Sequence, residues 1–193
     1  QIINRAQTQV RADLNSAWGL LDGEREKIET IVRLTVDRPD IARACEQQNW
    51  NTTTLRNQLE TIRMKYHLDF LSVMRPDGKV VLRSTPPYHD GDYFLSEPAF
   101  EMAARGETVT GITLMEAHRL NTEHQNLADR AFLIREETRR ARPSRKEVES
   151  RGMVLISAVP VMKGNIVEAM VYGGVLLNRN NALVERIEQS VFK

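Results

Sequence analysis

Residues 152–178, GMVLISAVPVMKGNIVEAMVYGGVLLN, are the most apolar run of the chain and decide its fold. The run is long enough to cross a membrane as a helix, which requires about 20 apolar residues with few charges. Its middle excludes that interpretation, because Pro160 would break a helix and the sequence KGN at 163–165 is typical of a turn. β-Branched residues are frequent on both sides of this turn. The run is therefore predicted to be a β-hairpin with strands at 153–162 and 166–177.

Both predicted strands are apolar at nearly every position, which indicates that both faces of their sheet are covered. Gly173 and Gly174 lie inside the second strand, where glycine favours a bulge or the close approach of a ligand or of backbone. Ser157 and Tyr172 are the polar members of the hairpin. A buried hydroxyl needs a partner, which can be backbone, an ordered water or a bound small molecule, so both residues are candidate ligand contacts.

The overall composition limits the function classes. The 193 residues fit one domain, or a compact domain with an appended element, and 41% of them are hydrophobic. The charges nearly cancel, to a net charge of +1, so no global field favours nucleic acid or an acidic membrane surface. The single cysteine, Cys45, excludes an intrachain disulfide and a CxxC motif. The chain begins with Gln1, which indicates a piece of a longer protein whose membrane segments lie outside it.

Enzymatic and metal-binding motifs are absent from the sequence. It contains no GxSxG, GxxxxGK or HExxH pattern and no cysteine with a histidine in a catalytic context. His118 and His124, with Glu116 and Glu123 nearby, raise the question of a metal site, but their spacing matches no helical or turn-based ligand pair. We therefore expect neither enzymatic activity, nor a metal, nor a cofactor in this piece.

The first 37 residues are predicted to form one long helix, because apolar residues recur at three- and four-residue spacing. The seam consists of Val10, Leu14, Ala17, Leu21, Ile28 and Ile31. A helix of this length overhangs a small domain, so the seam packs either on its own domain or on a partner chain.

Two shorter helices are predicted to follow the long one. The first ends near Gln48, and Asp37 or Asp40 is its expected N-cap. The second begins at an expected cap of Thr53 or Thr54.

From residue 67 the pattern changes to strands. The sequence RPDG at 75–78 is typical of a tight turn between two strands, and residues 108–115 are predicted to be a third strand. Between them lie the loop TPPYHDGDYF at 85–94 and a short helix that Ser96 is expected to cap.

The rest of the chain completes the element order. Residues 126–134 are expected to hold a helical turn or an edge strand, and residues 180–192 a closing helix. Basic and acidic residues interleave at 135–151, which favours a solvated loop over a nucleic-acid or lipid-headgroup patch. The order predicts an α+β fold, in which a long N-terminal helix precedes a five-stranded antiparallel sheet with flanking helices.

This element order, together with several short sequences, resembles the extracytoplasmic Cache (PAS-like) sensor domains of bacterial chemoreceptors and sensor histidine kinases. The resemblance is carried by FLSVMRPDGKVVLRS, YHDGDYF, FEMAARGETVTGI, LADRAF and the hairpin with GGVLLNRN. The chain looks most like the membrane-distal half of fused double Cache domains. The resemblance implies an N-terminal helical region at 1–66, a sensor core at 67–178 and a connecting helix at 179–193.

The resemblance also implies a function. It suggests an extracytoplasmic, periplasmic domain of an inner-membrane receptor that binds a small molecule, such as a carboxylate, and shifts its terminal helices. It allows a homodimer through the N-terminal helix, and a histidine kinase elsewhere in the longer protein. The run of Tyr, Arg and Trp that amino-acid-binding members use is not matched by RSTPPYHDGDYF, which disfavours an amino acid ligand.

Two other functions stay open at this stage. One is a structural or dimerisation module without a ligand of its own, in which a downstream domain does the sensing. The other is a cytoplasmic PAS-type cofactor binder, against which the long first helix and the absence of a CxxCH haem motif both argue.

The expected ligand site lies where the second strand meets the 85–94 loop. Arg83 ends that strand, and its guanidinium can bind a ligand carboxylate with two N–H groups or pair with Asp90 or Asp92. Arg130, between apolar neighbours in LADRAF, is a further ligand candidate or one half of a structural ion pair. Loops on a rigid scaffold often carry binding residues, and this one supplies Tyr88, His89 and Tyr93.

Overall fold

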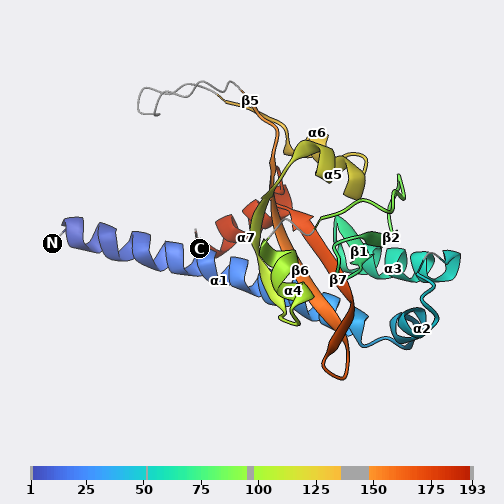
Figure 1. The fold of residues 1–193 in the computed structure, drawn as a ribbon. Coiled ribbons are helices and arrows are strands. Elements are labelled where there is room, and N and C mark those ends of the chain that lie inside the picture. The colour runs from blue at the N-terminus through green and yellow to red at the C-terminus, as the bar shows by residue number, and fades with distance from the viewer. Residues whose placement is uncertain (1, 51, 95–97, 136–147, 192–193) are drawn as a thin grey trace.

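The computed structural model describes residues 2–50, 52–94, 98–135 and 148–191. It has the α+β fold that the sequence predicts, with a long N-terminal helix and a five-stranded antiparallel sheet (Figure 1). The described helices are α1 (Ile2–Val36), α2 (Pro39–Gln47), α3 (Thr53–Tyr66), α4 (Pro98–Ala104), α5 (Ala117–Glu123), α6 (Leu127–Ala131) and α7 (Asn181–Val191). The described strands are β1 (Phe70–Met74), β2 (Val80–Arg83), β3 (Val109–Met115), β4 (Leu133–Ile134), β5 (Val148–Glu149), β6 (Gly152–Lys163) and β7 (Ile166–Leu176).

The hairpin predicted from residues 152–178 is the centre of the sheet. The strand order is β2-β1-β7-β6-β3, so β6 and β7 each have a neighbour on both sides. A Cβ atom added to Gly174 would lie 2.7 Å from the carbonyl oxygen of Leu155 and 2.8 Å from the ring of Phe70. This position therefore needs glycine because backbone and an aromatic ring approach it closely. The bulge of the hairpin lies elsewhere, between Val161 and Met162.

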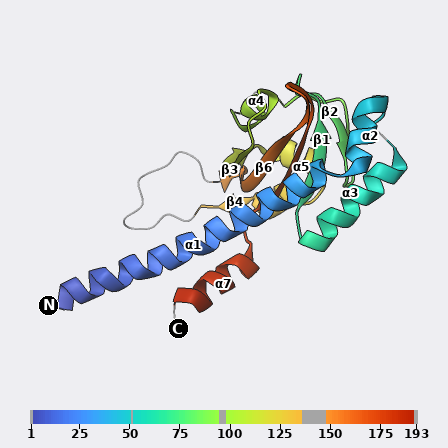
Figure 2. The same ribbon diagram turned by 90° about the horizontal axis from the view of Figure 1, so that it is seen from below.

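Helices cover both faces of the sheet, as the continuous apolar strands predicted. On one face α1, α2 and α3 close an apolar core that includes Ile28, Val32 and Leu59 (Figure 2). On the other face α4, α5 and α6 close a second core that includes Phe100 and Leu120. Burying each such side chain contributes roughly 1.5–3 kcal/mol, so both layers stabilise the sheet between them.

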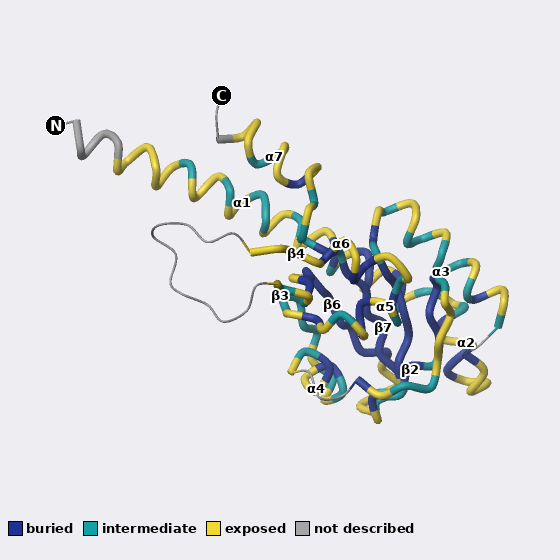
Figure 3. Tube along the Cα trace, turned by 90° about the horizontal axis from the view of Figure 1, so that it is seen from above, coloured by how far each residue is buried: buried dark blue, intermediate teal, exposed yellow. Residues whose placement is uncertain are grey.

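The two ends of the long helix α1 lie in different environments. Its C-terminal part packs on the sheet through Ile28 and Val32, whereas its N-terminal part extends away from the sheet (Figures 1 and 3). Trp18, in that extending part, is 61% exposed. Beside α1 runs α7, and Arg186 on α7 donates to Glu24 on α1 at 2.6 Å. The two terminal helices are therefore tied together at the edge of the domain.

The helix caps differ from those predicted. The N-cap of α2 is Arg38 rather than Asp37 or Asp40, because Pro39 takes the first helical position and Asp40 instead pairs with the Arg38 guanidinium at 3.0 Å. The N-cap of α3 is Thr52, not Thr53 or Thr54. Its extended backbone lets its hydroxyl accept the N–H of Leu55 at 3.2 Å.

The structure describes only some of the segments between the main elements. The predicted cap Ser96 and most of the 135–151 segment lie outside the described residues. Residues 126–134 contain both a helical turn, α6, and a short strand, β4. The polar stretch before them contains a helix that the sequence did not predict, α5, and this helix carries Glu123 into the core.

Candidate functional site

Three polar side chains form one row across three neighbouring strands. Arg83 on β2 lies opposite Ser72 on β1, and Ser72 lies opposite Tyr172 on β7. Directly opposite residues of an antiparallel sheet point to the same face, with Cβ atoms about 4.5–5.5 Å apart. All three side chains are fully buried on the face that α4, α5 and α6 cover. The strand register alone therefore gathers a guanidinium and two hydroxyl groups at one place.

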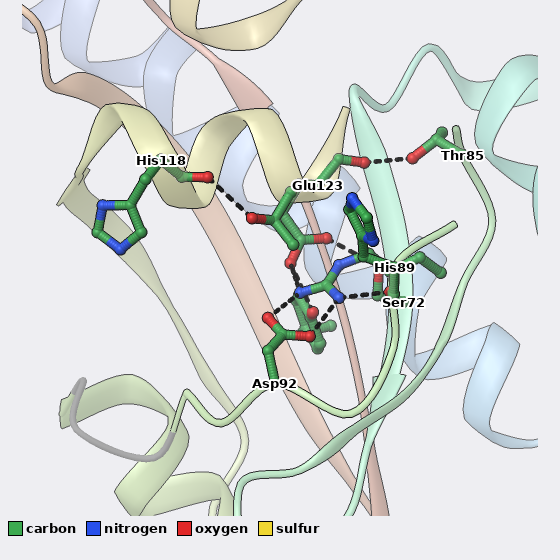
Figure 4. Close-up of polar contacts among 9 residues, drawn as sticks. Ser72, Thr85, His89, Asp92, His118 and Glu123 are labelled. Atoms are coloured by element: carbon green, nitrogen blue, oxygen red, sulfur yellow. Dashed lines mark hydrogen bonds and ion pairs between the residues drawn. The ribbon is translucent and has the colours of Figure 1, made fainter. Parts of the chain in front are cut away.

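A carboxylate from another part of the chain occupies this place. Glu123, the last residue of α5, is fully buried and accepts three hydrogen bonds (Figure 4). Its donors are the Ser72 hydroxyl at 3.0 Å, the Arg83 guanidinium at 3.0 Å and the Tyr172 hydroxyl at 2.7 Å. The hydroxyl of Thr85 donates to the Glu123 carbonyl oxygen as well, which fixes the end of α5 to the loop after β2.

The loop after β2 satisfies most of the remaining donors of Arg83. Two guanidinium nitrogens of Arg83 donate to the two carboxylate oxygens of Asp92, at 2.6 and 2.8 Å. One of these nitrogens also donates to the His89 carbonyl oxygen at 2.6 Å. We refer to Ser72, Arg83, Asp92, Glu123 and Tyr172 as the Arg83 cluster.

The protonation states in the cluster follow from these contacts. Burial acts to lower the pKa of Arg83, but the carboxylates of Glu123 and Asp92 raise it above its ordinary value, so the guanidinium stays charged. Burial and the negative charge of Glu123 raise the pKa of Tyr172 well above its ordinary value. The phenol therefore keeps its proton and acts as a hydrogen-bond donor.

Aromatic rings surround the polar groups. The Phe94 ring lies against two guanidinium groups. Its centroid is 5.2 Å from the guanidinium carbon of Arg83 and 3.7 Å from the guanidinium carbon of Arg119. The rings of Phe100 and Tyr172 meet edge to face at a centroid distance of 5.1 Å. An apolar wall with a few convergent polar groups is the usual construction of a small-molecule site.

The structure brings some of the predicted site residues together. Arg83 and Tyr172 share the cluster, and Arg83 makes the pairing with Asp92 that the sequence left open. His89 contributes its backbone carbonyl oxygen, while its side chain is exposed. Tyr88 and Tyr93 are also exposed, and the Tyr88 ring packs 4.8 Å from the guanidinium carbon of Arg56.

The structure places two other predicted residues away from the cluster. Ser157 is buried on the opposite face of the sheet, where its hydroxyl lies 2.9 Å from that of Thr110. Arg130 donates to Asp69 at 2.5 Å. It therefore forms a structural ion pair, which is one of the two roles that the sequence allowed. Sequence reasoning weighed Glu123 only as a metal ligand and did not consider Ser72.

Arg130 and Asp69 belong to a separate groove of about 490 Å³ between α1, the end of α3 and the start of α7. The second carboxylate oxygen of Asp69 accepts the N–H of Leu176, the last residue of β7, at 2.7 Å. Lys27 and Arg179 also line this groove. It therefore adjoins the point where the sheet leads into the terminal helix.

Comparisons with known proteins place the fold. No family model matches the chain, and no curated protein does. The sensor domain of the V. cholerae histidine kinase DctB matches with a TM-score of 0.63 at 14% identity, over 100% of this chain and 60% of that one. The E. coli DcuS sensor domain matches with a TM-score of 0.52 at 16% identity, over 90% of this chain and 98% of that one.

This chain has the fold of bacterial sensor domains. A third match is the ligand-binding domain of the Campylobacter jejuni chemoreceptor Tlp3 in complex with 4-methylisoleucine, with a TM-score of 0.50 at 8% identity. It extends over 96% of this chain and 60% of that one. The fold that the resemblance implied is therefore confirmed. The chain spans about 60% of the length of the DctB sensor domain.

Two features are absent from the described residues. No helix in these parts of the chain is both long and apolar enough to cross a membrane. In the same residues, no group of three or more His, Cys, Asp and Glu side chains is arranged to hold a metal ion.

Proposed function

We propose that this chain is the extracytoplasmic ligand-sensing domain of a transmembrane bacterial receptor, either a histidine kinase or a methyl-accepting chemotaxis protein. The observation that carries the proposal is the row of Arg83, Ser72 and Tyr172, three buried donors that converge from adjacent strands on one carboxylate. Stability alone does not require such a row, because a buried ion pair is often no more stabilising than apolar residues of the same size.

The donor set favours a small molecule with a carboxylate group. A guanidinium and two hydroxyl groups supply both charge and directional hydrogen bonds to such a group. The Nε of Arg83 is also buried and has no hydrogen-bond partner among the described residues. A ligand or an ordered water would satisfy it, since buried polar groups are rarely left unpaired. Tyr88, His89 and Tyr93 would line the entrance.

The three regions of the chain have separate roles in this proposal. Residues 67–178 are the sensor core, residues 1–66 form the helical region that leads to it, and residues 179–193 form the connecting helix. The membrane anchors and the output domain belong to a longer protein, and the sensor itself carries out no catalysis. Ligand binding selects one arrangement of the core, and the terminal helices move with it.

The exposed part of α1 would join two copies of the receptor. Val10, Leu14 and Trp18 are spaced by four residues, lie on one side of the helix and are all more than half exposed. Such a stripe fits the same stripe of a second copy related by a twofold axis.

A structural module without a ligand of its own is the second candidate function. The observation that favours it is that Arg83 is 0% exposed, so the chain's own side chains fill the site. In this alternative, the Arg83 cluster only fixes the loop after β2 and the end of α5, and another domain does the sensing.

A thermal-shift screen with a matched pair of variants distinguishes the two. Acetate, propionate, succinate and longer carboxylates are compared with the corresponding amines. An acid present at a hundred times its dissociation constant stabilises the native state by about 2.7 kcal/mol. Ser72→Ala should weaken binding roughly tenfold or more, because it removes a hydrogen bond to a charged group worth about 1.5–3 kcal/mol.

Ser157→Ala is the control, because Ser157 is an equally buried serine of the same sheet that faces away from the cluster. It should leave binding unchanged. If no acid or amine stabilises the natural chain, or the variant Glu123→Gln in which the competing negative charge is removed, the structural module is the better interpretation.

A further inference from the structure

Glu123 differs from every other member of the Arg83 cluster in its origin. Ser72, Arg83 and Tyr172 stand on strands of the sheet, and Asp92 lies in the loop that continues β2. Glu123 instead comes from α5, a helix of 7 residues outside the sheet, and reaches partners 40–51 positions away in the sequence. The sheet supplies the donors, and a separate segment supplies the acceptor.

Arg83 does not depend on Glu123 for charge balance. Asp92 already accepts two of its hydrogen bonds, at 2.6 and 2.8 Å, in the geometry typical of a strong guanidinium–carboxylate pair. Asp92 is held in place by its own backbone, whose carbonyl oxygen accepts the N–H of Val80 at 2.9 Å. The departure of Glu123 would therefore leave a guanidinium that Asp92 still neutralises.

The departure of Glu123 would nevertheless leave hydroxyl donors buried without an acceptor. An unpaired buried donor costs free energy, so the open site favours any group that accepts the same hydrogen bonds. The Glu123 carboxylate shows which group fits, since it already lies within 3.0 Å of all three donors. A carboxylate of a small molecule has the same charge and the same geometry.

We infer that Glu123 is an internal occupant of the ligand site, and that an acidic ligand binds by displacing it together with α5 and α6. The inference rests on the proposed sensing function and specifies its regulation. Glu123 keeps the site closed in the absence of ligand, and its competition sets the ligand concentration to which the domain responds.

The displaced segment also has a direct connection to the terminal helices. The helix that follows α5 carries Arg130, which binds one oxygen of Asp69, while the other oxygen holds the N–H of Leu176 at the end of β7. Beyond Leu176 the chain enters α7, which Arg186 ties to Glu24 of α1. Movement of α5 and α6 therefore loosens the hold on the strand end from which α7 starts.

The test measures binding of the same carboxylates to the natural chain and to Glu123→Gln by titration calorimetry. The amide keeps the size of the side chain and removes its negative charge. If Glu123 occupies the site roughly nine-tenths of the time, its release raises the apparent affinity for an acid roughly tenfold. Glu116→Gln is the control, because Glu116 is an exposed glutamate that adjoins the same helix, and it should not change affinity.

A second variant and a second measurement keep the test conclusive if Glu123→Gln folds poorly. Thr85→Val removes the hydroxyl that holds the end of α5 and leaves every donor of the site intact. It should raise affinity for acids in the same direction and by less. Amide hydrogen exchange across residues 117–131 should become faster in both variants, and in the natural chain when an acid is bound.

The outcomes separate this inference from the proposed function. Tighter acid binding by Glu123→Gln, or binding by that variant alone, supports the displacement of Glu123. If the natural chain binds acids while Glu123→Gln and Thr85→Val bind them equally or more weakly, the inference is wrong and the sensing function stands. If neither the natural chain nor either variant binds an acid, both are wrong.

Discussion

The two faces of the central sheet are built on different principles. The face beneath α1, α2 and α3 is almost entirely apolar, with Ile28, Val32 and Leu59 at its core. The opposite face buries the Arg83 cluster among aromatic rings. An apolar core gains stability from every buried group, whereas a buried ion network roughly offsets its own desolvation cost. The difference fits the proposal that one face maintains the fold while the other recognises a charged group.

The largest expected effect comes from breaking the ion network on one side only. Arg83→Met leaves Glu123 buried without its cationic partner and should lower the free energy of unfolding by about 3–5 kcal/mol. The double variant Arg83→Met/Glu123→Met removes both buried charges and should recover part of that loss, although the hydroxyls of Ser72 and Tyr172 then lack their acceptor. Urea denaturation of the natural chain and the two variants measures this. A double variant as unstable as the single one would contradict the view that the network contributes little stability.

A substitution on the apolar face should change the free energy of unfolding without changing the affinity for a ligand. Leu59→Ala opens a cavity in a fully buried position and should cost about 2–5 kcal/mol. It should leave the affinity for any acid that the natural chain binds unchanged, since Leu59 faces the other core. Denaturation and calorimetry on the same sample check both. A large loss of affinity would show that the two faces are coupled more tightly than their separate cores indicate.

The pH dependence of stability should depend in part on His124, which follows α5. Burial, followed by the positive charge of Arg63, lowers the pKa of His124 below its ordinary value of 6.5. The unfolded chain therefore takes up the proton more readily. The stabilisation is fully present above pH 6.5 and is lost as the pH falls through the lowered pKa.

His124→Gln should flatten this part of the curve of unfolding free energy against pH. The contribution of Glu29 falls in a different range, because Arg33 and Thr110 lower its pKa below 4.5 and its effect is lost only at more acidic pH. If this curve has the same slope just below pH 6.5 in His124→Gln as in the natural chain, the effect does not come from His124.

The smallest effect on stability is expected at the exposed part of α1. Trp18→Ala should change the free energy of unfolding by no more than about 0.5 kcal/mol, because the side chain is exposed in the monomer. It should weaken self-association, as measured by sedimentation velocity at increasing protein concentration. Leu34→Ala is the control, because Leu34 is also 61% exposed but lies on the part of α1 that packs on the sheet. Equal effects of both variants would argue against an interface at the extending part.

Local signals were enough to predict most of the fold. The turn at 163–165, the RPDG turn and the apolar strands give the hairpin and the β1–β2 pair, because these depend on neighbours in sequence. The helix α5 was missed because its polar sequence carries little periodicity, and its burial depends on partners far away in the chain.

The residues of the candidate site were predicted only in part, because the sequence does not show how β6 and β7 are paired. If the pairing of Lys163 with Ile166 continued without interruption, Ser157 would lie opposite Tyr172 on one face. The bulge between Val161 and Met162 shifts the pairing by one residue, so Ser157 lies opposite Gly173 and faces the other core. A one-residue shift moves every side chain to the opposite face, and no pattern in the sequence marks this bulge.

The part of α1 that extends beyond the sheet can act as a lever arm. The roughly 20 residues before Leu21 rise about 1.5 Å each, so this arm is about 30 Å long. A tilt of about 5° where the arm leaves the sheet would carry its far end about 2.6 Å sideways, given that length. The pair of Arg186 and Glu24 joins α7 to α1 three residues after Leu21. A side-chain exchange in the core can thus become a displacement of about 2–3 Å at the far end of α1, without any large movement of the sheet.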